Sequence, residues 1–200
     1  MRIVAGRFKG AALAAPKSQA TRPTSDRLRE TIFNILAHGL DVDLTGFRVL
    51  DLFAGTGALG FEAISRGARH GTFIEEGAEA RGLIRSNMET LGLNGAAKIF
   101  RRDATKLGAA GTVEPFDMVF ADPPYDRQLG EKALASAALG GWLKQDSICV
   151  LEERASVEID VPDGFEVLDG RKAGDSQIVF LRFSGASGHH DIDGLPDRQA

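Results

Sequence analysis

Short apolar runs alternate with amphipathic segments along most of this chain, the pattern of strands that alternate with helices. Strands are predicted where apolar runs stand between turn residues, at 48–53, 72–74, 97–101, 118–121 and 147–152. Helices are predicted between them at 58–66, 78–91 and 128–139. Two last strands, 165–168 and 177–183, flank the turn residues Gly174-Asp175 and are predicted to be antiparallel. The alternation predicts an α/β fold, with a mostly parallel sheet covered on both faces.

The amino-terminal segment has a different pattern. Residues 2–4 and 8–13 flank Gly6 and predict a small β-hairpin. A helix is predicted to begin near Thr24 or Ser25 as its amino cap. Its apolar stripe has helical spacing and consists of Leu28, Ile32, Ile35 and Leu36.

Three parts of the chain follow from these elements. Residues 1–40 form the basic hairpin and helix, expected to pack on a catalytic α/β domain of residues 41–183. Residues 184–200 are rich in Gly, Ser, Asp and His, lack an apolar period and are expected to be disordered. The adjacent His189 and His190 lack the spacing and supporting ligands of a metal site, so no metal is expected. The other two histidines, His38 and His70, are interpreted as surface residues.

Composition agrees with a single domain in the cytoplasm. With 200 residues and 43% apolar content, the chain is long enough to bury a full core. The single cysteine, Cys149, lies in an apolar run and is expected to be a buried structural thiol. Neither a signal-peptide layout nor an apolar run of about 18 residues, the length of a membrane span, is present.

A glycine-rich turn follows the strand 48–53. Gly55, Gly57 and Gly60 match the G-x-G-x-x-G pattern between a strand and a helix, where glycines let a ligand approach the backbone. The acidic pair Glu75-Glu76 ends the next strand at about the 20-residue distance expected of a ribose-binding carboxylate. A nucleoside cofactor is indicated, and this spacing fits nicotinamide enzymes and S-adenosylmethionine-dependent methyltransferases equally.

Three observations favour S-adenosylmethionine. Asp51 is an anion near the turn, which suits a cationic ligand better than a pyrophosphate. Asp103 follows the third strand and is a further acceptor, suited to an adenine amine. A dehydrogenase usually carries a separate catalytic domain with an acid or base such as histidine, and no histidine stands at a strand end here.

The run Asp122-Pro123-Pro124-Tyr125 ends the strand 118–121, because prolines cannot continue a sheet ladder. One explanation of this run is structural: the strand ends there and is closed by a turn. The carboxyl edge of an open α/β sheet is also where ligands bind. Asp122 suits an amine as a hydrogen-bond acceptor, and Tyr125 suits a planar base as a stacking partner.

The net charge of −4 is unevenly distributed. Residues 1–30 carry seven cations against two anions, which leaves −9 for the remainder. This basic stretch is the expected nucleic-acid face, although a solvated charged hairpin has the same composition.

These motifs together resemble those of class I S-adenosylmethionine-dependent methyltransferases that act on exocyclic amines. The segments 2–10 and 22–36, above all Arg22-Pro23-Thr24-Ser25-Asp26-Arg27, resemble the RsmD family of bacterial 16S ribosomal RNA guanine-N2 methyltransferases. The likeness spans roughly residues 2–183. It implies a doubly wound seven-stranded Rossmann-like sheet in the order 3-2-1-4-5-7-6. It also implies guanine 966 as target, in an assembled small ribosomal subunit. The protein is expected to be a monomer.

The resemblance assigns roles to matching positions. The cofactor would contact Asp51, Phe53, Gly55, Gly57, Glu75, Asp103, Arg22 and Thr24. The catalytic group would be Asp122, Pro123, Pro124 and Tyr125. RNA phosphates would be bound by Arg7, Lys9, Arg22 and Arg27. Glu76 is the alternative to Glu75 as the ribose-binding residue, and helix capping is an alternative role for Thr24.

Other functions fit the same residues. The Asp-Pro-Pro-Tyr run also suits adenine N6 in DNA or RNA, or a protein glutamine amide. A non-catalytic RNA-binding module with a retained nucleoside pocket is a further alternative, disfavoured by the intact carboxylates and glycines.

Overall fold

The computed structural model describes residues 1–16, 26–125 and 128–185. Seven strands form one sheet in the order β3-β2-β1-β4-β5-β7-β6, which confirms the predicted fold class. They are β1 (Arg48–Leu52), β2 (His70–Ile74), β3 (Ala97–Phe100), β4 (Phe116–Ala121), β5 (Leu143–Arg154), β6 (Phe165–Ala173) and β7 (Ser176–Phe183). The first five pair in parallel, and β7 pairs antiparallel to both β5 and β6.

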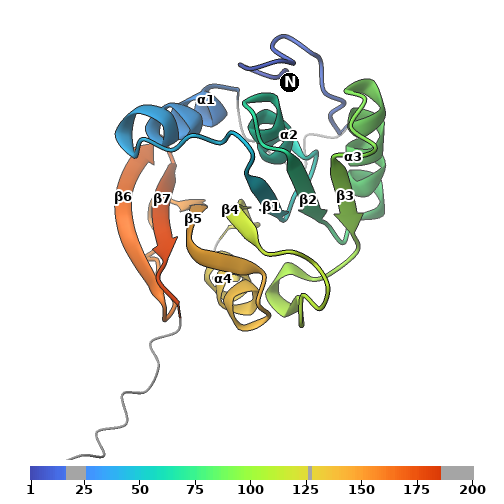
Figure 1. Ribbon diagram of the computed structural model, residues 1–200. Helices are drawn as coiled ribbons and strands as arrows, with labels where there is room; N and C mark the ends of the chain where they lie inside the picture. The colour runs from blue at the N-terminus through green and yellow to red at the C-terminus, as the bar shows by residue number, and fades with distance from the viewer. Residues whose placement is uncertain (17–25, 126–127, 186–200) are drawn as a thin grey trace, which may run out of the picture.

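Four α-helices cover the sheet. They are α1 (Asp26–Asn34), α2 (Ala58–Ser65), α3 (Ala78–Thr90) and α4 (Leu129–Leu139). Figure 1 shows α1, α2 and α3 on one side of the sheet and α4 on the other. A π-helical turn, Ile35–Gly39, continues α1. The residues before Asp26, where the helix start was predicted, lie outside the described ranges.

Each face of the sheet has its own apolar core. Phe33, Phe61 and Phe120 belong to the core under α1, α2 and α3, and Trp142 belongs to the core under α4. Ile3 from the amino-terminal segment is buried in the first of these cores. This burial joins the amino-terminal segment to the main domain through shared apolar contacts, since buried apolar area stabilises the packing.

The amino-terminal arm, defined here as residues 1–16, contains less regular structure than predicted. A single antiparallel bridge joins Arg2 to Ala12, and the described part of the arm contains no longer strand pairing. Gly6 turns the chain with a φ of 80°, and Arg7 N–H donates to the Ser65 carbonyl of α2 at 2.8 Å. Backbone hydrogen bonds from the Ile3 N–H to the Ala11 carbonyl and from the Gly10 N–H to the Ile3 carbonyl nevertheless close the predicted hairpin, and the arm bonds to α2 as well.

Glu62 of α2 fastens the arm. Its two carboxylate oxygens accept the N–H groups of Val4 and Ala5 at 2.8 and 3.0 Å. The same buried carboxylate pairs with Arg29 of α1 at 3.5 Å. A buried charge needs such partners, because a carboxylate that loses water must find donors in the protein.

Several smaller predictions concern β5, the last hairpin and two side chains. Strand β5 is longer than predicted, and Gly174 makes the predicted turn with a φ of 63°. Cys149 is buried, and burial raises the pKa of its thiol to about 12. The surface interpretation of His70 was wrong: it is half-buried in β2, and burial lowers its pKa to about 4.

Within the described residues, no helix is both long and apolar enough to cross a bilayer.

Candidate active site

A cavity of about 940 Å³ opens at the carboxyl ends of the parallel strands. Residues that follow β1, β2, β3 and β4 all line it. Strand order reverses between β1 and β4, and such a switch point leaves a crevice in which ligands of α/β proteins bind. Most predicted site residues meet here: Asp51, Phe53, Gly55, Glu75, Asp103, Asp122, Pro123, Pro124 and Tyr125.

The glycine loop, defined here as residues 53–57, forms one wall. Phe53 and Gly55 both have left-handed backbones, with φ values of 58° and 56°. The left-handed region is costly for a phenylalanine, and such strain is often found at ligand sites. Gly57 is not among the cavity-lining residues; a Cβ there would come within 2.5 Å of Phe61 Cε2, so this glycine allows close packing.

Asp51 stands at the buried end of the cavity with 2% of its surface exposed. Its Oδ2 accepts the Gly60 N–H of α2 at 2.9 Å. Burial raises the pKa of this carboxyl well above its usual value, and the charges of Asp122 and Glu75 raise it further. A cation bound nearby would favour the ionised form, because an opposite charge offsets the lost hydration.

Glu75 spans the glycine loop and the start of α3. Its Oε2 accepts the Gly55 N–H at 2.8 Å, and its Oε1 accepts the Gly77 N–H at 2.7 Å. These bonds hold the carboxylate at the cavity wall. Glu76, the competitor for the same role, is exposed and also lines the cavity.

Asp103 begins the 3-10 turn Ala104–Lys106. Its Oδ1 accepts the backbone N–H and the hydroxyl of Thr105 at 2.8 and 2.7 Å. The hydroxyl bond is the main cause that lowers the pKa of Asp103, so the group stays ionised at neutral pH. A fixed anion at the end of β3 results.

Tyr125 is held by its hydroxyl. The hydroxyl donates to Glu152 Oε1 of β5 at 2.9 Å and lies 3.1 Å from Ser176 Oγ of β7. Burial raises the tyrosine pKa to about 12, so the hydroxyl keeps its proton and remains a donor at neutral pH. The guanidinium carbon of Arg154 lies 5.6 Å from the ring centroid. The ring is thereby oriented at the cavity, next to Asp122 in the chain.

The cavity is strongly acidic. Six carboxylates line it, Asp51, Glu75, Glu76, Glu79, Asp103 and Asp122. Arg102 is the one cation among the lining residues that the structure describes. Such a lining attracts cationic ligands and repels a pyrophosphate. No cluster of three metal-ligating side chains occurs within the described ranges.

Three of the predicted RNA-binding residues are described by the structure and are not among the residues that line this cavity. Arg7 and Lys9 are exposed on the arm, and Arg27 is exposed on α1. Arg22 and Thr24 lie outside the described residues, so their predicted roles stay predictions.

Sequence reasoning missed several lining residues. Glu79 and Leu83 stand one helical turn apart on α3, and this spacing was the available signal. Pro16 of the arm and Thr56 of the glycine loop also line the cavity, and no local motif marked Pro16. Glu152 and Ser176 were missed because the contacts that bring them to Tyr125 cross the sheet.

Comparison with known proteins decides the family. The family model described as "Conserved hypothetical protein 95" matches residues 1–182. The chain belongs to this family. The Escherichia coli K12 protein named "Ribosomal RNA small subunit methyltransferase D" is 38% identical over 195 residues, 96% of this chain and 94% of the relative. The Haemophilus influenzae protein of the same name is 32% identical over 176 residues, 87% and 89% of the two chains.

Solved structures agree with this family assignment. The Escherichia coli protein yhhF, described as a methyltransferase, has a TM-score of 0.78 and 32% identity, and the match covers 92% of this chain and 98% of yhhF. The Haemophilus influenzae protein HI0767, described as a methylase, has a TM-score of 0.71 and 27% identity, with 91% and 97% covered. The resemblance to the RsmD family is thus confirmed.

Proposed function

We propose that this protein transfers a methyl group from S-adenosylmethionine to the exocyclic N2 amine of a guanine in 16S ribosomal RNA, guanine 966 by family resemblance. One observation carries the proposal: Asp122 and Tyr125 line the same cavity as Asp51, Glu75 and Asp103. Donor and acceptor groups of a transfer reaction must meet in one site, since positioning removes much of the barrier.

The cavity suits S-adenosylmethionine chemically. The cofactor carries a sulfonium and an ammonium, and the acidic lining offsets both charges. Asp51 faces the cationic part, Glu75 accepts from the ribose hydroxyls and Asp103 accepts from the adenine amine. The glycine loop gives the backbone close access. When bound, the cofactor supplies a methyl group that is already activated.

Asp122, Pro123 and Tyr125 in the same cavity suit a planar amine. The lone pair of a guanine N2 amine is conjugated with its ring, which makes the nitrogen a weak nucleophile. Asp122 accepts one N–H and the Pro123 carbonyl accepts the other, so that the nitrogen becomes pyramidal and the developing positive charge is stabilised. Tyr125 stacks on the base and keeps it in line with the methyl group. Asp122 or a water takes the released proton.

The substrate is an unpaired nucleotide of ribosomal RNA. A ring can stack on a guanine only when the base is splayed out of a helix, so a loop nucleotide is favoured. The cations Arg7, Lys9 and Arg27 bind its flanking phosphates. Two relatives named for the small ribosomal subunit support that substrate. The protein acts as a monomer in the cytoplasm, where ribosomal subunits assemble.

The test is transfer of labelled methyl groups to four substrates: assembled small subunits, free 16S RNA, DNA and a protein release factor. We expect label on small subunits, and nucleoside mass spectrometry should place it on a guanine N2. Label on adenine N6 or on a glutamine would favour the alternatives of the same fold. Cofactor binding without transfer to any substrate would identify a non-catalytic RNA-binding module.

Asp122→Ala tests the catalytic assignment. Loss of a preorganised acceptor should lower kcat by about 10²–10³-fold, while the Kd for S-adenosylmethionine changes little. Asp117→Asn is the control, because Asp117 lies near the start of β4, at the end of the strand away from Asp122, and pairs with Lys144 at 2.7 Å. A large loss of cofactor affinity in Asp122→Ala would mean that this carboxylate binds the cofactor and not the amine.

A further inference from the structure

Asn87 of α3 bridges two parts of the molecule that the proposed function uses separately. Its side chain is 1% exposed. Its Oδ1 accepts the N–H of Ala14 in the arm at 2.7 Å, and its Nδ2 donates to the Thr56 carbonyl at 3.0 Å. One amide therefore joins the arm, which carries the predicted RNA-binding residues, to the glycine loop at the cavity.

Other contacts support this link. Pro16, two residues beyond Ala14, lines the cavity together with Thr56. The Thr56 hydroxyl lies 3.8 Å from the Met1 sulfur at the other end of the arm. Leu13 is buried in the core under α1, α2 and α3. The arm therefore contacts the glycine loop directly at Met1 and is linked to it through Asn87 at Ala14.

The arm also has a second attachment that does not involve the cavity. Glu62 and Ser65 of α2 hold residues 4–8 through backbone N–H groups. Arg7 and Lys9 project from this part of the arm and are exposed. Residues 9–13 connect this part of the arm to Ala14, so the chain that carries the two cations is anchored at Glu62 on one side and at Asn87 on the other.

We propose that Asn87 is a positioning residue that couples the arm to the glycine loop, so that RNA bound by the arm strengthens cofactor binding in the cavity. This inference rests on the proposed function. The coupling is reciprocal by thermodynamic necessity: a bound cofactor strengthens RNA binding by the same factor. The amide acts through the Thr56 carbonyl, whose position depends on the backbone that carries Gly55 and Gly57.

The experiment measures this factor without turnover. Isothermal titration gives the Kd of S-adenosylhomocysteine, the unreactive product form of the cofactor, with and without saturating 16S RNA. For the wild-type chain we expect RNA to lower this Kd by about fivefold or more, the usual lower range of coupling between sites. In Asn87→Ala the factor should fall to about one, because all the side-chain hydrogen bonds of Asn87 to Ala14 and Thr56 are removed.

Asn87→Asp and Asn94→Ala are the matched variants. Aspartate keeps an acceptor for Ala14 but has no donor for Thr56, so it should also lose the coupling. Asn94 is exposed in the turn that follows α3, and its variant should keep the wild-type factor. Wild-type coupling in both Asn87 variants would overturn the inference.

A measurement on the unaltered chain covers the case in which Asn87 variants fail to fold. Amide hydrogen exchange at residues 54–58 should slow when RNA is added. The coupling is overturned if the exchange rate does not change with RNA, or if RNA leaves the Kd of S-adenosylhomocysteine for the wild-type chain unchanged. Either result counts even if methyl transfer to RNA proceeds. Absence of methyl transfer, by contrast, overturns the proposed function, so the two failures are distinguishable.

Discussion

At the scale of single residues, Tyr125 presents its ring to the cavity and its hydroxyl to the sheet. The hydroxyl bonds to Glu152 and Ser176 restrict the orientation of the ring. A fixed ring loses less conformational freedom when a base stacks on it, which favours binding. Under the proposed function, Glu152 and Ser176 would therefore support the base site from outside it.

Tyr125→Phe separates the two parts of this side chain. The variant keeps the stacking surface and loses about 1 kcal/mol of hydrogen bonding, so kcat/KM for RNA should fall about fivefold. Tyr125→Ala also removes the stacking, worth about 1–3 kcal/mol, so its kcat/KM should be roughly 5-fold to 150-fold below that of the Phe variant. Steady-state kinetics on small subunits measure both. Equal losses in the two variants would show that the ring does not stack on the base.

His70 makes folding stability depend on pH. Its folded pKa of about 4 is below the usual 6.5, because burial and the nearby charges of Arg48, Lys98 and Arg69 disfavour the cation. Between these two values the unfolded chain binds the proton and the folded chain does not. Stability attributable to His70 is therefore complete above pH 6.5 and decreases as the pH falls toward 4.

Urea unfolding from pH 8 to pH 4 measures this effect. His70→Gln should lose less stability over that range than the wild-type protein, because glutamine does not titrate. His38→Gln is the control, since His38 is exposed. The same pH dependence in the wild-type and His70→Gln proteins would contradict the assignment.

At the scale of elements, the contact between α2 and the sheet depends on glycine. A Cβ on Gly60 would come within 2.9 Å of Phe73 Cζ and 3.1 Å of Asp51 Oδ2. This close approach lets Asp51 accept the Gly60 N–H, which places the carboxylate at the cavity. The third glycine of the motif thus serves packing between helix and strand.

Gly60→Ala should lower the free energy of unfolding by about 1–3 kcal/mol, because the added methyl overpacks this contact. Affinity for S-adenosylmethionine should also fall as Asp51 moves. Gly82→Ala is the matched control: it lies in α3 with nothing within 4 Å of an added Cβ, and it should stabilise the helix by up to about 1 kcal/mol. Denaturant unfolding and calorimetric titration measure the two effects. Equal stability of the two variants would argue against close packing at Gly60.

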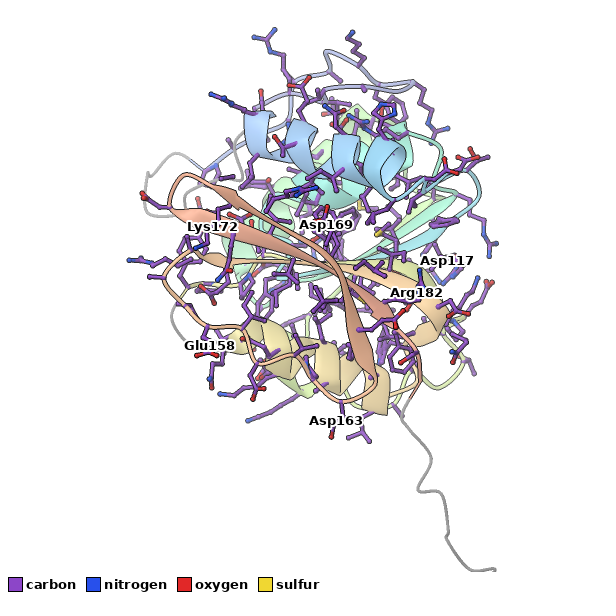
Figure 2. The ribbon with its side chains drawn as sticks, turned by 90° about the vertical axis from the view of Figure 1, so that its left-hand side faces the viewer. Asp117, Glu158, Asp163, Asp169, Lys172 and Arg182 are labelled. Carbon is purple, nitrogen blue, oxygen red and sulfur yellow. The ribbon has the colours of Figure 1, made fainter. Side chains whose placement is uncertain are left out.

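At the scale of the whole molecule, the cations of the arm and two exposed acidic residues lie on opposite sides of the sheet. The exposed cations of the arm lie on the side of the sheet that carries α2. Figure 2 shows Glu158 and Asp163 on the side that carries α4. Under the proposed function, this arrangement would orient the protein on RNA, since long-range fields act during association. The net charge of −4 is therefore compatible with RNA binding.

Arg7→Ala with Lys9→Ala tests this orientation. RNA affinity should fall, and the slope of log K against log salt should flatten by roughly one unit for each phosphate that the variant no longer binds. Lys132→Ala with Lys172→Ala is the matched control, because it removes two exposed cations on α4 and β6. Filter binding over a range of salt concentrations gives both slopes. A slope that stays at the wild-type value in the arm variant would place the arm outside the RNA interface.

Much of the sheet and of the cavity was predictable because the signals are local. A glycine-rich turn, or a carboxylate at a strand end, is read within a few residues, and parallel strands bring their carboxyl ends to one edge. Asp51, Glu75, Asp103 and Asp122 therefore converge as expected. The limit of such reasoning shows at Gly57, which belongs to the motif but lies outside the cavity lining.

The sequence by itself determined the fold class, the strand ends that carry carboxylates and the uneven charge, because periodicity and motif spacing are properties of the chain. Only the tertiary structure decided which distant groups meet. Asn87 reaches Ala14 across 73 residues and Tyr125 reaches Glu152 across 27. It also decided that the arm bonds to α2 and that His70 is half-buried. Such contacts depend on packing between elements, and no local pattern encodes them.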